Sequence, residues 1–122
     1  SILGLSFKPN TDDVRDSSAI EMIEGLLSLG AHVRAYDPIA NSNMKKRFPL
    51  VEYADNWQSA VKDSSGVVIL TEWNEFRGID LVELASLVKE KIVLDTRNIL
   101  SMNELSKLGF TFDNVGRKKS DR

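Results

Sequence analysis

The chain has 122 residues, which is enough for one ordinary domain and too few for two. Its 42% hydrophobic and 28% charged residues, with a formal net charge of −2, are typical of a globular protein that has no global attraction to nucleic acid or to an anionic membrane. The absence of cysteine and the single histidine exclude disulfides, thiolate metal sites and multi-histidine metal sites. No apolar run approaches the roughly 20 residues of a membrane span, and we find no secretory signal. We therefore expect a cytoplasmic location and neither a membrane nor a nucleic-acid partner.

Apolar runs rich in β-branched residues alternate with helical patterns along the chain. The clear strand predictions are Ile2–Phe7, His32–Tyr36, Val67–Thr71 and Ile92–Thr96, and weaker ones fall at Val51–Tyr53 and Phe110–Phe112. The runs GVVILT and KIVLDT are almost continuously apolar, as expected of strands that are buried on both faces.

Helical patterns lie between these strands. The first is an apolar stripe formed by Ile20, Ile23, Leu26 and Leu27. Ser18 and Glu21 have capping-box spacing at its start, and Gly30 suits the position after its end. Short helices are predicted for Pro38–Arg47, Asn56–Lys62 and Met102–Leu108, and a second stripe is formed by Leu81, Leu84, Ala85 and Val88.

Strands that alternate with helices predict an α/β fold. We expect a single domain with a Rossmann-like, doubly wound, mainly parallel sheet of about five to six strands and right-handed crossovers. Ligands of such sheets bind beyond the carboxyl ends of the strands. That rule selects five segments as candidate site elements: Phe7–Arg15, Asp37–Pro38, Ala54–Asn56, Thr71–Trp73 and Asp95–Asn98.

The glycine fingerprint of dinucleotide-binding turns is missing. No two of the seven glycines are separated by one residue, and the first connection is long and bulky. A pyrophosphate could not lie against the backbone at the start of a helix there. We therefore expect that this sheet does not hold NAD in the usual manner.

The first connection, SFKPNTDDVRDSS, is instead rich in charge. Lys8 and Arg15 lie within it, and Arg97 follows a later strand at the same predicted edge. Three cations at one edge suit a phosphorylated ligand, because lysine acts as a point charge and arginine as a bidentate fork. The alternative is a set of ordinary surface ion pairs, worth about 0–1 kcal/mol each, with the carboxylates Asp12, Asp13, Asp16 and Asp95.

Three other side chains near this edge each have two interpretations, and His32, at the start of a strand, has one. Phe7 could stack on a ligand, but a place in the core is the better prediction. Trp73 could stack on a base, but we expect it to anchor the following loop. Asp37 resembles a carboxylate that holds a ribose hydroxyl, and without the glycine fingerprint a turn-forming Asp-Pro is favoured. His32 is expected to be solvated.

The longest motifs resemble those of a known family. GLSFKPNTDDVRDSSA, GAHVRAYDP, VVILTEWNEFRGID and VLDTRNIL occur in family order and closely resemble the C-terminal domain of the UDP-glucose/GDP-mannose dehydrogenase family. The resemblance covers nearly the whole chain, and the TEW-x-EF segment is most similar to bacterial UDP-glucose 6-dehydrogenases. In this family an N-terminal Rossmann domain binds NAD, a central helix mediates dimerisation, and the C-terminal domain closes over the nucleotide sugar.

The resemblance implies roles for individual residues. Phe7 and Lys8 match the pair that contacts the nucleotide sugar, and Arg97 matches an arginine that contacts the substrate. Arg15 matches the arginine that reaches NAD across the domain gap. We add that Asp12 and Asp13 hold Lys8 and Arg15 in place. The implied reaction oxidises the C6 alcohol of a UDP-sugar, UDP-glucose first among them, to the uronate with two NAD, in polysaccharide biosynthesis.

The family's cysteine nucleophile, catalytic lysine and glycine fingerprint have no counterpart here. We therefore interpret the chain as a piece of a longer protein, with the UDP-binding domain at residues 1–116, a polar tail at 117–122, and the NAD-binding and central helical domains outside it. No catalytic residue or metal ligand is expected. The expected partners are a UDP-sugar, the N-terminal domain and a second subunit.

Two alternative functions, each from another class of protein, were also considered for the chain. A phospho-receiver module would use Asp12, Asp13, Asp55 and Thr71, but the acidic pair is too far past the first strand and the lysine expected after the fifth strand is replaced by TRN. A pure oligomerisation domain would have lost its ligand contacts. The presence of Lys8, Arg15 and Arg97 argues against that second alternative.

Overall fold

The computed structural model describes residues 1–114, so the expected tail at 117–122 lies outside the described residues. Six parallel strands form one sheet in the order β3-β2-β1-β4-β5-β6. The strands are β1 (Ile2–Leu3), β2 (Arg34–Tyr36), β3 (Glu52–Tyr53), β4 (Val67–Ile69), β5 (Ile92–Asp95) and β6 (Thr111–Asn114). The predicted doubly wound α/β fold is confirmed.

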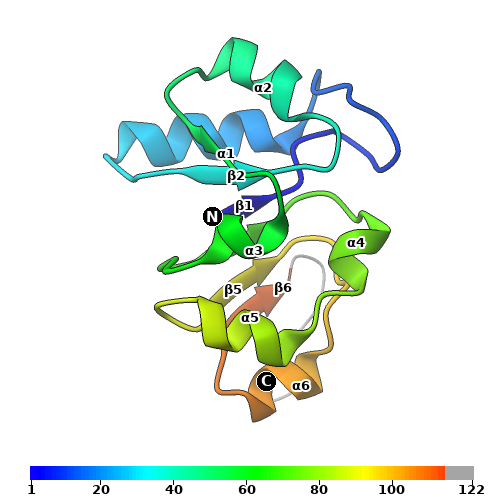
Figure 1. The fold of residues 1–122 in the computed structure, drawn as a ribbon, viewed down its shortest axis with the longest axis vertical. Coiled ribbons are helices and arrows are strands. Elements are labelled where there is room, and N and C mark those ends of the chain that lie inside the picture. The colour runs from blue at the N-terminus through cyan, green and yellow to red at the C-terminus, as the bar shows by residue number, and fades with distance from the viewer. Residues whose placement is uncertain (115–122) are drawn as a thin grey trace.

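The helices alternate with these strands. They are α1 (Ser18–Ser28), α2 (Asn41–Arg47), α3 (Trp57–Val61), α4 (Asn74–Arg77), α5 (Leu81–Leu87) and α6 (Met102–Lys107). In Figure 1, α1 and α2 lie at one end of the view and α5 and α6 at the other. The short helix α4 was not predicted, because its four residues are too few to show a period. None of the helices among residues 1–114 combines the length and the apolar character needed to cross a membrane.

Two hydrophobic cores lie on the two faces of the sheet. Helices α1 and α2 contribute Ile23 and Met44 to one core, and helices α3, α5 and α6 contribute to the other. Successive strand residues point to opposite faces, so Ile2 of β1 belongs to the first core and Leu3 to the second. This double burial explains why the strands are almost continuously apolar in sequence.

Strand β1 is shorter than the predicted Ile2–Phe7. Its ladder ends after Leu3 because Gly4 has φ +100 and turns the chain, while its amide donates to the Tyr36 carbonyl at 2.9 Å. A Cβ on Gly4 would lie 2.6 Å from the backbone nitrogen of Thr71. Only glycine allows the ends of β1 and β4 to approach this closely.

The N-cap of helix α1 lies one residue before the predicted cap. Ser17, not Ser18, is the N-cap: its backbone is extended and its hydroxyl accepts from the amide of Ala19 at 3.1 Å. Asp16, at φ 59, turns the chain immediately before it. Gly30, at φ 82, follows the helix as predicted.

The strand order contradicts a phospho-receiver. The flavodoxin-like sheet of receivers has the order 2-1-3-4-5, whereas this sheet continues the order β3-β2-β1. Thr71 is fully buried and donates its hydroxyl to the carbonyl of Ser6 at 2.6 Å, so it does not face a phosphoryl group. Among the described residues no group of three acidic or histidine side chains could hold a metal ion.

The glycine at the end of β1 gives a test of this packing. Gly4→Ala should lower the free energy of unfolding by more than about 2 kcal/mol, because it adds both backbone strain and a clash with Thr71. Gly25→Ala is the matched control, since nothing lies within 4 Å of its Cβ position. In the middle of α1 it should stabilise the chain by about 0.5–1 kcal/mol. Urea unfolding followed by circular dichroism measures both values, and equal midpoints for the two variants would contradict the close approach.

Candidate functional site

The candidate site lies at the carboxyl edge of the sheet, between β1 and β4. The strand order reverses at this point, with β2 and β3 on one side and β5 and β6 on the other. In doubly wound sheets the loops diverge at such a reversal and leave a crevice in which ligands bind. The loops after β1 and β4 flank this point, and the loop after β5 is the next one along the same edge.

Asp37, directly after β2, is 1% exposed, and β2 is the strand next to β1. Its Oδ2 atom accepts hydrogen bonds from the backbone amides of Leu5 and Ser6 at 2.8 and 3.1 Å. The indole Nε1 of Trp73 donates to the same oxygen at 3.1 Å. Its Oδ1 atom accepts from the next two non-proline amides of its own loop, at 2.9 and 3.0 Å. The turn-forming reading of Asp37 is confirmed, and so is the anchoring reading of Trp73.

Phe7 and Lys8 are both exposed and directly follow the buried residues Leu5 and Ser6. The prediction that Phe7 belongs to the core is wrong, because its side chain is 40% exposed. The chain turns away from the sheet at Gly4, so Phe7 no longer follows the strand's alternation. The Lys8 ammonium lies 5.4 Å from the centroid of the Phe7 ring. No ion pair among the described residues includes Lys8, so the proposed partnership with Asp12 is not found.

Arg97 lies on the other side of β4, after β5. Its Nε donates to the carbonyl of Leu70 at 2.8 Å and lies 3.6 Å from the carboxylate of Glu72. The expected partner Asp95 is fully buried and accepts the backbone amide of Arg97 instead, at 3.1 Å. With strands about 4.8 Å apart, the ends of β1 and β5 are about 10 Å apart. Lys8 and Arg97 therefore belong to the loops that follow the two neighbours of β4 in the sheet.

Arg15 stands apart from these two cations. Its side chain is 87% exposed at the entrance to α1, and it forms a bidentate pair with Asp13 at 2.9 and 3.1 Å. The predicted pairing of Asp13 with Arg15 is confirmed. Hydrogen bonds from Arg15 lower the pKa of the Asp13 carboxyl to about 2. The loop itself is closed at its base, where the Phe7 amide donates to the Asp13 carbonyl at 3.1 Å.

A second connection joins β2 to helix α4 near the same edge. The hydroxyl of Tyr36 donates to the carboxylate of Glu75 at 3.0 Å. Burial, with this hydrogen bond, raises the pKa of Tyr36 well above its usual range. The ring of Tyr36 also packs edge-on against Phe76, with centroids 6.0 Å apart. Helix α4 is therefore held against the end of β2, beside the loop that carries Trp73.

The comparisons with known proteins agree with this geometry. A sequence model described as "UDP-glucose/GDP-mannose dehydrogenase family, UDP binding domain" matches residues 1–102. The chain belongs to this family. It is 42% identical over 117 residues to a UDP-glucose 6-dehydrogenase of Rhizobium meliloti (strain 1021), an alignment that covers 96% of this chain and 27% of that protein.

Two solved structures of family members have the same fold. A UDP-glucose dehydrogenase from the archaeon Pyrobaculum islandicum is 36% identical, with a TM-score of 0.72 over 84% of this chain and 22% of that one. A UDP-D-ManNAc dehydrogenase from Pyrococcus horikoshii is 28% identical, with a TM-score of 0.76 over 95% of this chain and 25% of that one. The chain thus spans about a quarter of the length of the relatives that it matches.

The sequence reasoning missed two features of the site. Glu72 was not considered as a partner of Arg97, although its place directly after β4 and beside β5 could have indicated it. The buried role of Asp37 was also missed, because a sequence cannot show which loop amides lack a partner. The folded chain thus shows that Glu72 lies beside Arg97 and that Asp37 accepts from the loops after β1 and β4.

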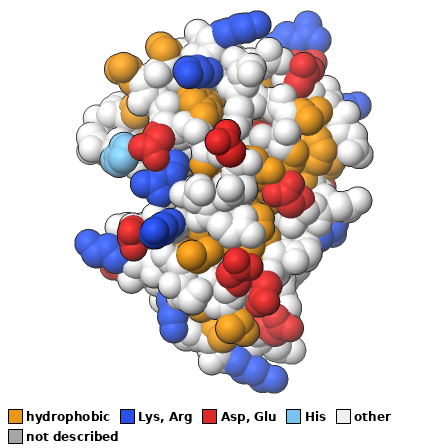
Figure 2. All heavy atoms as spheres, viewed as in Figure 1, with side chains coloured by type: hydrophobic (Ala, Val, Ile, Leu, Met, Phe, Trp, Pro, Cys, Tyr) orange, Lys and Arg blue, Asp and Glu red, His pale blue; other side chains and the backbone are white. Residues whose placement is uncertain are grey.

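The surface carries no continuous positive stripe on the face drawn in Figure 2, where basic and acidic side chains are interspersed. That distribution agrees with the net charge of −2 and with a site for one small anionic ligand. The three candidate cations, Lys8, Arg15 and Arg97, lie in the loops that follow β1 and β5.

The Asp13–Arg15 pair predicts a pH dependence. Because its pKa in the folded chain is depressed from 3.8 to about 2, the carboxylate's contribution to stability is present above pH 3.8 and is lost as the pH falls through 2. The pair is at the surface, so the change in stability should be small. An NMR titration of the Asp13 carboxyl should have its midpoint near 2, and in Arg15→Gln it should move up toward 3.8. An unchanged midpoint in that variant would rule out Arg15 as the cause.

Proposed function

We propose that the chain is the nucleotide-sugar-binding domain of an NAD-dependent dehydrogenase that oxidises the C6 alcohol of a UDP-sugar to the uronate. The observation that carries the proposal is that Lys8 and Arg97 lie in the loops after β1 and β5, the two neighbours of β4, in a chain that matches the family's UDP-binding domain. UDP-glucose is the proposed substrate, since the most similar relatives include several proteins named UDP-glucose 6-dehydrogenase.

The chemistry of the crevice supports a diphosphate ligand. Lys8 has no anionic partner within 4 Å among the described residues and can donate to a phosphate as a point charge. Arg97 is 34% exposed and is held in place by Leu70 and Glu72, so a phosphate can reach its guanidinium without a large rearrangement. Phe7 offers an exposed aromatic face on which an apolar part of the ligand can pack.

The residues of this chain do not form an NAD site of their own, and we propose only one contact to NAD from this chain. The connection from β1 to α1 has no glycine fingerprint and runs through the long charged loop, so a pyrophosphate cannot rest at the start of α1. Arg15 is different, because its side chain is 87% exposed and pairs only with Asp13 of its own loop. We propose that Arg15 donates to the phosphates of NAD, the hydride acceptor, held mainly by an N-terminal domain of the longer enzyme.

The remaining partners and boundaries belong to the same proposal. The domain is assigned to residues 1–116, and the longer enzyme is proposed to be a cytoplasmic homodimer. The chain contains no cysteine, and the thiolate that the family resemblance implies must come from another part of that enzyme. The isolated chain is therefore a binding domain without turnover of its own.

Binding of UDP by the chain itself is the direct test. We expect weak binding, in the high micromolar range or weaker, because the chain supplies only part of the site while the cost of ordering the ligand is undiminished. NMR shift changes on titration with UDP should centre on Phe7, Lys8 and Arg97. Lys8→Ala should lose roughly 1.5–3 kcal/mol of binding free energy, as for a hydrogen bond to a charged group.

Arg15→Ala is the matched control for Lys8→Ala. It removes a cation from the same loop, but one that projects away from the crevice, so UDP binding by the chain should be unchanged. Equal losses in the two variants would indicate general electrostatic attraction and not a site at Lys8. Shifts confined to the amino edge of the sheet would contradict the proposed placement.

Arg15 carries its own prediction in the longer enzyme. Arg15→Ala should leave the stability of this domain within about 0.5 kcal/mol, as for surface positions generally. It should raise the Michaelis constant for NAD and largely spare that for the nucleotide sugar. Arg15→Lys should restore function only in part, because the bidentate fork is lost. Steady-state kinetics with each substrate varied in turn would reveal an unchanged NAD dependence, which would remove Arg15 from the cofactor site.

A further inference from the structure

Asp37 connects the two halves of the proposed nucleotide site. Through Oδ2 it accepts the amides of Leu5 and Ser6, the two residues that directly precede Phe7 and Lys8. Through the same atom it accepts the indole of Trp73, the residue that directly follows Glu72. Glu72 in turn lies 3.6 Å from Arg97. One carboxylate oxygen is therefore bonded to the loop that carries Lys8 and to the loop whose Glu72 lies beside Arg97.

The loop after β1 depends on few other contacts. Its ladder with the neighbouring strands ends at Leu3, and beyond that point Ser6 is held by Asp37 and by the hydroxyl of Thr71, at 2.6 Å from its carbonyl. The Ser6 hydroxyl also approaches the Lys8 carbonyl, at 2.8 Å. The position of Lys8 is consequently set by groups that are themselves bonded to Asp37.

Asp37 cannot contact a ligand itself, since it is 1% exposed and both its oxygens accept hydrogen bonds from protein groups. No ion pair among the described residues includes it, so a buried charge is balanced by neutral donors alone. An arrangement of this kind orients loop backbone firmly, because every donor would be left unpaired in any other loop position.

We propose that Asp37 is a positioning residue for nucleotide binding, which holds the Lys8 loop and the Trp73 loop in register so that Lys8 and Arg97 meet one diphosphate. The inference rests on the proposed function, because it concerns the same site. A group that the ligand never touches would then set whether the loops have the geometry that binds UDP.

Asp37→Asn tests this role, because charge removal and loss of positioning predict opposite changes in UDP affinity. Donors face both oxygens of Asp37, so no orientation of an amide satisfies both sides. Removal of a negative charge near an anion site should by Coulomb attraction alone tighten UDP binding. Positioning predicts the reverse: the UDP dissociation constant should rise about 10–100-fold, since a displacement of about 1 Å at a binding group has effects of that size.

A stability-matched variant separates positioning from folding. Val61→Ala removes fully buried methyl groups at the end of α3, and it should destabilise the chain without a change in UDP affinity. All titrations are made by NMR at a temperature at which circular dichroism shows every variant to be folded. A wild-type dissociation constant in folded Asp37→Asn, or an equal loss in Val61→Ala, would overturn the inference.

Trp73→Phe decides the question if Asp37→Asn does not fold. It keeps an aromatic ring and removes only the Nε1 donor, so it should weaken UDP binding less than Asp37→Asn but measurably, with the shifts of Arg97 more affected than those of Lys8. An unchanged affinity in Trp73→Phe would then overturn the inference. A wild-type chain that binds no UDP would be a different result: the proposed function would fail, and the inference would fall with it.

Discussion

The carboxyl edge of the sheet depends on one constraint: every backbone amide that is buried where a strand ends must find an acceptor. Two buried carboxylates meet most of that need. Asp37 accepts amides from its own loop and from the loop after β1. Asp95, fully buried at the end of β5, accepts the amides of Arg97, Ile99 and Leu100 at 2.8–3.1 Å. Both carboxylates are buried, so the cations proposed to bind phosphate, Lys8 and Arg97, lie in the more exposed loops around them.

The long first loop combines a fixed base with an exposed tip. At its base, Leu5 and Ser6 are buried and bonded, and Phe7 closes the loop through the Asp13 carbonyl. At its tip, Arg15 is held only by a surface pair that water screens. A fixed base suits the ligand contact that is proposed for Lys8, which follows Phe7 directly. A solvated tip suits a residue that meets a group presented by another domain.

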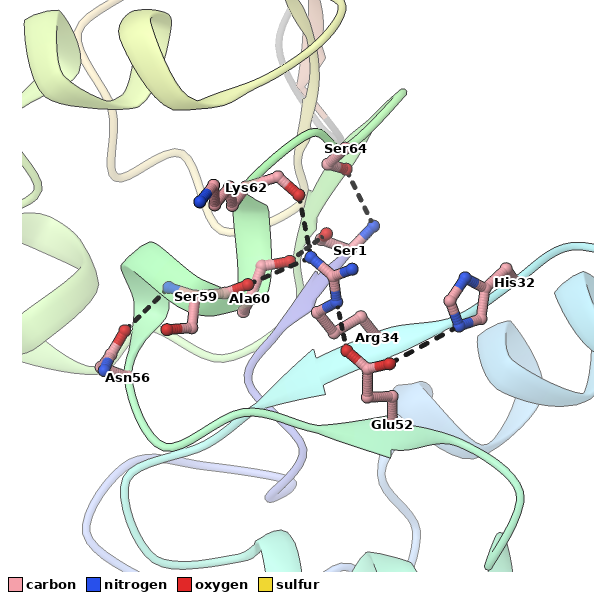
Figure 3. A network of polar contacts seen from close by, with 9 residues as sticks. All are labelled: Ser1, His32, Arg34, Glu52, Asn56, Ser59, Ala60, Lys62 and Ser64. Atoms are coloured by element: carbon pink, nitrogen blue, oxygen red, sulfur yellow. Dashed lines mark hydrogen bonds and ion pairs between the residues drawn. The ribbon is translucent and has the colours of Figure 1, made fainter.

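The opposite edge of the sheet is organised differently. Arg34 of β2 donates to the carbonyls of Ser59 and Lys62 at 3.1 and 2.8 Å, and it pairs with Glu52 of β3 at 2.7 Å (Figure 3). His32 beside it is 75% exposed, as the sequence predicted. This network ties the end of α3 to β2 and β3, with the cation at a helix C-terminus, where it is favoured. Its charges are used to join elements, so this edge has the character of a structural contact.

Hydrophobic periodicity by itself determined the order of strands and helices along the chain and therefore the doubly wound class. The central strands are buried on both faces, so they are almost continuously apolar in sequence. The charge of the first connection and of the TRN segment was enough to indicate Lys8, Arg15 and Arg97, whereas Phe7 entered the site only through the resemblance to the family. Only the tertiary structure decided that Phe7 is exposed, that Ser17 caps α1, that Glu72 faces Arg97 and that Asp37 is buried. The burial of Asp37 depends on the amides and the indole that the loops after β1 and β4 bring to it, and the Glu72–Arg97 contact depends on the loops after β4 and β5. Both are properties of segments far apart in sequence.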